Sequence, residues 1–131
     1  KAYKEANRRE GSAGDNLMIL LETRLDAVVY RLGFARTIFA ARQYVAHGHF
    51  TVNGVRSFSP SRLIKAGDVV AVREQSKEHV QIKEAIASAA AAPEYLSVDL
   101  GKMQGTLVKL PLRDQIPVKL EEQLVVEYYS Q

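Results

Sequence analysis

Two pairs of side chains have types and spacings that could perform chemistry. His47 and His49 flank a single glycine, and imidazoles are common ligands of zinc and other transition metals. Glu22 and Asp26 stand four residues apart, so a helix would put both carboxyl groups on one face, as an acid–base pair requires. Two imidazoles with no carboxylate or thiolate close by make a poor metal site. We therefore predict no metal site and no catalytic residues, and we interpret the two acids as ion-pair partners of Arg24 and its neighbours.

Other signatures of catalysis and cofactor binding are missing from the sequence. It contains no phosphate-binding G-x-x-x-x-G-K-[ST], no dinucleotide-binding G-x-G-x-x-G and no nucleophile motif G-x-S-x-G. It has no cysteine, which excludes disulfides, thiolate catalysis and Cys-ligated zinc within these 131 residues. No apolar stretch reaches the roughly 18 residues of a membrane span. We expect a protein without cofactor that is neither an enzyme nor inserted in a membrane.

Positive charge is concentrated in the middle of the chain. Between Arg24 and Arg73 there are eight basic and two acidic residues, and seven of the eight cations are arginine. Residues 74–131 carry a net charge of −3 instead. Arginine matches phosphate with a planar fork and stacks on bases, so the block favours a nucleic-acid partner. The alternative is a solvated basic face that only keeps the protein soluble.

The third expected helix, which begins after Thr37 and ends at Gly48, lies inside this basic block. Its first amide groups and the positive end of its dipole could seat a phosphate. Ile38, Ala41 and Val45 share one face, which should pack on the core. The polar residues on and beside the helix could meet RNA, namely Arg36, Thr37, Arg42, Gln43, His47 and His49. An ordinary amphipathic surface helix remains the alternative.

The elements that position these residues follow from periodicity and turn signals. Asp15 is expected to cap a helix before Thr23, and T-R-L-D is expected to open the next helix as a capping box. Asn53-Gly54 predicts a hairpin. Further strands are expected at Val69–Val72, Leu96–Leu100 and Thr106–Leu110, and Ser76 is expected to cap a helix over Lys77–Ala92. A charged helix in residues 1–10 and a helical tail after Pro117 complete the prediction.

The central residues resemble a known family. The elements RLD..VYR.GF, ARQ.V.HGH and VNG…PS, followed by GD, are similar to those of the S-four RNA-binding domain. The flanking YKEANRREGSAGDNLMILLE, YLSVDLGKMQGTLVKLP and EQLVVEYYS resemble the family of small ribosomal subunit protein four, bacterial or organellar. That family has further N-terminal residues, so the chain is expected to begin inside a longer protein.

The resemblance implies an α+β fold in which two helices pack on a small antiparallel sheet, with a helical lobe built from both chain ends. It implies three parts: residues 1–22 in the lobe, 23–92 as the RNA-binding domain with its following helix, and 93–131 as further strands and a helical segment. The implied RNA-binding residues are Arg24, Arg31, Arg36, Thr37, Arg42, Gln43, His47, His49, Asn53, Ser59 and Ser61.

The implied role is structural. Members of the family bind small-subunit ribosomal RNA near a 5′ multi-helix junction, nucleate assembly and contact ribosomal protein S five and other small-subunit proteins, an interface linked to translational accuracy. The expected location is a ribosome, in a bacterial cytoplasm or in an organelle. The alternatives are the targeting module of an RNA-modifying enzyme, for whose catalytic domain the chain leaves no room, and an RNA-binding adaptor that uses the acidic carboxyl half.

Overall fold

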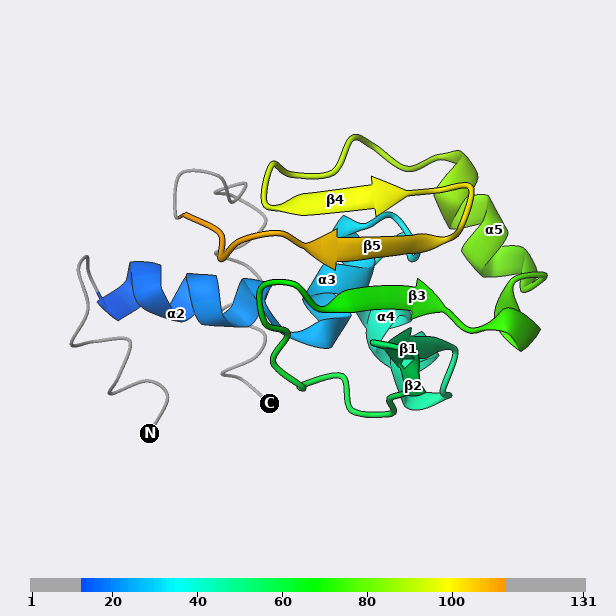
Figure 1. Cartoon of the computed structure of the whole chain (residues 1–131), viewed down its shortest axis with the longest axis horizontal. Coiled ribbons are helices and arrows are strands. Elements are labelled where there is room, and N and C mark those ends of the chain that lie inside the picture. Colours follow the sequence, from blue (N-terminus) through cyan, green and yellow to red (C-terminus); the bar gives the residue numbers. More distant parts are fainter. Residues whose placement is uncertain (1–12, 113–131) are drawn as a thin grey trace.

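The computed structural model describes residues 13–112 of the 131-residue chain. The charged helix expected in residues 1–10 and the helical tail expected after Pro117 lie outside the described residues. Of the helical lobe predicted from the two chain ends, the description includes α2 (Ala13–Glu22), which extends away from the sheet in Figure 1.

One antiparallel sheet of five strands organises the fold, in the order β2-β1-β3-β5-β4. The strands are β1 (Phe50–Val52), β2 (Val55–Arg56), β3 (Val69–Val72), β4 (Leu96–Asp99) and β5 (Gln104–Leu107). Because β5 pairs with β3, strands on both sides of residue 92 share this sheet. Helices and an antiparallel sheet together confirm the predicted α+β class.

The hairpin between β1 and β2 forms where the sequence predicts it. Asn53 and Gly54 both have positive φ, 52° and 83°, the combination that a two-residue hairpin turn requires. Thr51 pairs with Arg56, and Val52 with Val55. The return strand is short, since Ser57 leads into a loop at Pro60.

Two helices pack on the sheet and fill the core. In Figure 1, α3 (Leu25–Arg31) and α4 (Ile38–Ala46) lie behind the strands. Valines and a leucine from the helices and the strands are at most 2% exposed and share one buried cluster, namely Val28, Leu32, Val45, Val52 and Val70. The rings of Phe34 and Phe50 stack within this cluster, with centroids 6.0 Å apart. The presence of Ala41 and Val45 in this cluster confirms the core-facing side predicted for α4.

The predicted capping box at Thr23 is wrong. The N-cap of α3 is Arg24, and its side chain makes no capping hydrogen bond. The Thr23 hydroxyl instead donates to the Leu20 carbonyl at 2.7 Å, because α2 runs on almost to the start of α3. The helix that Asp15 was expected to cap begins at Ala13, so Asp15 lies inside it and the predicted cap is wrong as well.

The long helix predicted over residues 77–92 is also shorter than expected. A 3-10 turn, η1 (Glu74–Ser76), comes first, and α5 spans only Val80–Ala87. His79 caps α5, its Nδ1 accepting from the Ile82 amide at 3.3 Å. The Ser76 hydroxyl lies 2.7 Å from His49 Nδ1 and accepts from Arg73 Nε at 3.3 Å, so Ser76 does not cap the helix.

Strand β5 begins two residues before the predicted strand and includes Gly105, which the prediction left between the two strands. Gly105 pairs with Val70 on one side and Val98 on the other. A Cβ at residue 105 would overlap the Leu32 side chain of α3, so glycine lets the helix approach the sheet closely. The turn itself is made by Met103, whose φ is 53°.

Candidate nucleic-acid interface

The start of α4 is capped by Thr37 and exposed beside Arg36. Thr37 Oγ1 accepts the Ala40 amide at 3.0 Å, which confirms the predicted cap. Ile38, Ala41 and Val45 are buried, as the apolar face predicts. Arg36 before the cap is exposed, and so are Gln43 and His47 further along the helix. The positive end of the helix and a cation therefore face solvent together.

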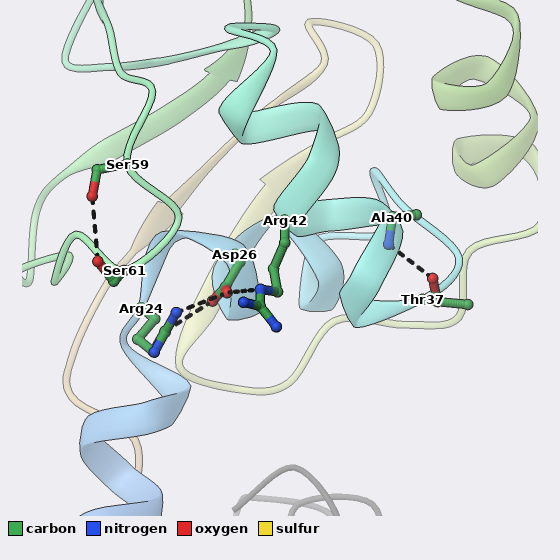
Figure 2. A network of polar contacts seen from close by, with 7 residues as sticks. All are labelled: Arg24, Asp26, Thr37, Ala40, Arg42, Ser59 and Ser61. Atoms are coloured by element: carbon green, nitrogen blue, oxygen red, sulfur yellow. Dashed lines mark hydrogen bonds and ion pairs between the residues drawn. The ribbon is translucent and has the colours of Figure 1, made fainter. Parts of the chain in front are cut away.

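A buried carboxylate joins the beginning of α3 to α4. Asp26 has no exposed surface, and Arg24 donates to it from Nε (3.3 Å) and Nη2 (3.2 Å). Arg42 approaches from α4, with its Nε 3.8 Å from Asp26 Oδ2. Figure 2 shows the two guanidinium groups on either side of the carboxylate. The Asp26 carboxylate thus sets the positions of two predicted RNA-binding arginines.

Arg42, predicted to meet RNA, also takes part in an ion pair. Its side chain is 31% exposed, and its guanidinium pairs with Asp26, one of the two acids predicted to pair with Arg24 and its neighbours. The pairing follows from helix geometry, since α3 and α4 pack closely and Asp26 faces α4. Arg42 is therefore both an ion-pair partner and a partly exposed cation.

Ser59 and Ser61 lie on the loop beside Arg24 in Figure 2, with their hydroxyl oxygens 3.4 Å apart. Both are exposed. This loop is attached to α3 through its backbone, because the Leu25 amide donates to Arg62 O (2.8 Å) and the Asp26 amide to Pro60 O (3.0 Å). The structure therefore brings the predicted loop serines next to the Asp26 ion pair.

Arg31 occupies an internal position, unlike the other predicted RNA-binding arginines. Its side chain is 9% exposed, and its Nε donates to Glu22 Oε1 at 2.7 Å. The Tyr95 hydroxyl donates to the same oxygen, also at 2.7 Å. Burial and the Glu22 carboxylate raise the pKa of Tyr95, so its hydroxyl keeps the proton that it donates. The predicted pairing of Glu22 and Asp26 with neighbouring arginines is confirmed.

Two other predicted site residues make structural contacts. His49 is half-buried beside Ser76, with its ring centroid 4.8 Å from that of His79. Burial, followed by the neighbouring His79, holds the pKa of His49 below its ordinary value, which favours the neutral imidazole. Asn53 donates to Asp68 Oδ1 (3.0 Å) and accepts the Val69 amide (2.9 Å), which fastens the hairpin turn to β3.

Arg56 and Phe58, two exposed residues on the hairpin side, are absent from the RNA-binding residues predicted from the sequence. Arg56 donates from Nε to the Gly48 carbonyl (2.8 Å), and its guanidinium carbon lies 4.8 Å from the centroid of the Phe58 ring. A signal was present, because the alternation Arg56-Ser57-Phe58 puts the two exposed residues on one side of a buried serine. Arg62 and Lys65 in the next loop are exposed cations as well.

Within residues 13–112, no group of three or more His, Cys, Asp or Glu side chains is arranged to hold a metal ion. No helix in the same part of the chain has the length and apolar character needed to cross a membrane.

Comparison with known proteins agrees with this geometry. Residues 23–70 match the S4 domain, which covers α3, α4 and the hairpin. The chain is 49% identical over 130 residues to small ribosomal subunit protein uS4 of Geobacillus stearothermophilus and 52% identical over 133 residues to that of Granulibacter bethesdensis. Each alignment covers 99% of this chain and 65% of the relative, so the chain spans slightly less than two thirds of their length.

The fold, the basic surface and the domain match together define an S4-domain protein. The similarity of the chain to the uS4 proteins extends beyond the domain on both sides. Over nearly its whole length the chain is similar to proteins of the small ribosomal subunit protein uS4 family.

Proposed function

We propose that this chain is a structural constituent of the small ribosomal subunit and a primary binder of its ribosomal RNA. The observation that carries the proposal is the arrangement of Arg24 and Arg42 around the buried Asp26, with Arg36 exposed at the beginning of α4. Cations at fixed positions suit folded RNA, which is recognised by its shape and phosphates because its major groove is too narrow for side chains.

The proposed role is binding rather than catalysis. It includes early assembly near a 5′ multi-helix junction of the RNA and a contribution to translational accuracy through ribosomal protein S five. We place the contact with S five and other small-subunit proteins in the carboxyl-terminal region from about residue 113, outside the described residues. The relatives named above are bacterial, which supports a bacterial ribosome, and an organellar ribosome is the second location consistent with the family.

Affinity for small-subunit ribosomal RNA should fall steeply as salt rises. Each phosphate that the protein neutralises contributes roughly 0.7–0.9 to the slope of log K against log salt concentration. Filter binding in a KCl series measures this slope. Arg36→Ala should lower it by about one phosphate contact.

Lys83→Ala is the matched control. Lys83 is an exposed cation on α5 that pairs with Glu78 at 3.0 Å, outside the S4 domain match. It should leave both slope and affinity unchanged. An affinity for the RNA that stays constant through the KCl series would contradict binding through phosphates. Equal effects of Arg36→Ala and Lys83→Ala would contradict an RNA-binding surface at the start of α4.

A further inference from the structure

Arg56 and Phe58 are two exposed side chains in contact on the hairpin side of the domain, here called the Arg56–Phe58 platform. Phe58 is 53% exposed and is absent from the buried clusters, so about half of its surface stays available to a ligand. The Arg56 guanidinium lies 4.8 Å from the ring centroid, within the range of a cation–π contact. An aromatic ring and a guanidinium thus share one exposed position.

The platform is held in place by the backbone of the α4–β1 turn. Arg56 Nε donates to the Gly48 carbonyl at 2.8 Å. A Cβ at Gly48, whose φ is +82°, would lie 2.5 Å from Phe58 Cε2 and 2.8 Å from Arg56 Nε. Glycine at this position therefore lets both side chains rest directly on the turn. The hydrogen bond and the close contact fix the platform before any ligand arrives, which reduces the ordering entropy lost on binding.

We propose that the Arg56–Phe58 platform stacks an unpaired base of the ribosomal RNA. This inference rests on the proposed function and adds a second mode of contact to it. Aromatic rings and arginine planes are the groups on which proteins stack unpaired RNA bases. The same segment also exposes the cations Arg62 and Lys65 and the hydroxyls of Ser59 and Ser61, beside the apolar Val55 and Leu63. Cations and hydroxyls suit the phosphates and sugars of a nucleotide.

Stacking and phosphate contacts respond differently to salt, and that difference provides the test. Phe58→Ala should weaken binding to small-subunit ribosomal RNA about tenfold at every KCl concentration, with the slope unchanged, because stacking releases no counterion. Phe58→Tyr should bind as the unaltered chain does. Val80→Ala, which truncates an exposed apolar side chain on α5, should also leave affinity unchanged.

The absence of tryptophan from the chain allows a direct second readout. Phe58→Trp introduces a single indole that should stack on the base, so its emission should be quenched when the RNA is added. Val80→Trp reports from α5 and should keep its emission. The far-ultraviolet circular dichroism and melting of each variant confirm that it is folded.

Unaltered affinity of Phe58→Ala together with unquenched Phe58→Trp would overturn the platform and leave the salt-dependent function standing. If Phe58→Ala bound the RNA as tightly as the unaltered chain but lost binding to other small-subunit proteins, the platform would be assigned to a protein partner. If the unaltered chain failed to bind the RNA at all, both the platform and the proposed function would be contradicted.

Discussion

Glu22→Ala is expected to lower the free energy of unfolding by about 3–5 kcal/mol, the usual effect of removing one partner of a buried ion pair. Glu22 is 1% exposed, and its Oε1 accepts from both Arg31 and Tyr95 at 2.7 Å. Without the carboxylate, the nearly buried Arg31 guanidinium loses its contact with Glu22, and the buried Tyr95 hydroxyl loses this acceptor. Urea denaturation of the variant and the unaltered chain measures the difference.

Glu84→Ala provides the matched control, because Glu84 is an exposed glutamate on α5 and should change stability by no more than about 0.5 kcal/mol. Glu22→Gln keeps an acceptor oxygen but loses the charge, so its stability should fall between the two. A Glu22→Ala chain as stable as the control would mean that the Glu22–Arg31–Tyr95 network does not hold α2 and α3 to the sheet.

Asp26→Asn is expected to weaken RNA binding by about tenfold, which corresponds to 1.4 kcal/mol. The effect is expected even though removing the carboxylate makes the net charge of the basic block more positive. Asp26 holds Arg24 by two hydrogen bonds and draws Arg42 to 3.8 Å. The neutral amide cannot pair with both guanidinium groups, so they lose their common orientation toward phosphate. Filter binding at fixed salt measures the change, and a thermal melt of the same sample shows that it is folded.

Glu84→Gln makes the same change of charge on α5 and should leave binding unaltered or slightly stronger. Arg42→Ala should weaken binding less in the Asp26→Asn chain than in the unaltered one, because interacting residues are not additive. Tighter binding by Asp26→Asn would show that net charge, rather than the fixed positions of Arg24 and Arg42, determines affinity.

Features that depend on neighbouring residues could be predicted from the sequence. Asn53-Gly54 forms the hairpin turn because these residue types tolerate positive φ, and Thr37 caps α4 because its hydroxyl reaches an amide three residues on. The apolar face of α4 follows from its periodicity in the same way. Each of these features is determined by residues that are close together in the chain.

Features that depend on distant residues could not be predicted in this way. Arg31 and Arg36 look alike in the sequence, yet Arg31 is enclosed by Glu22 and by Tyr95, whose hydroxyl meets Glu22 across 73 positions of the chain. Ser76 is a good helix cap by type, but its hydroxyl is engaged by His49, 27 positions away. The residue type alone does not show which partner a side chain will have when that partner comes from a distant part of the chain.

Ultraviolet crosslinking of small ribosomal subunits that contain this chain, with the crosslinked peptides identified by mass spectrometry, tests the central claim most directly. The account predicts crosslinks to ribosomal RNA from peptides within residues 24–73, including those carrying Arg36 and Phe58, and few from α5. Crosslinks confined to residues after 73, or purified small subunits that lack the chain altogether, would contradict it.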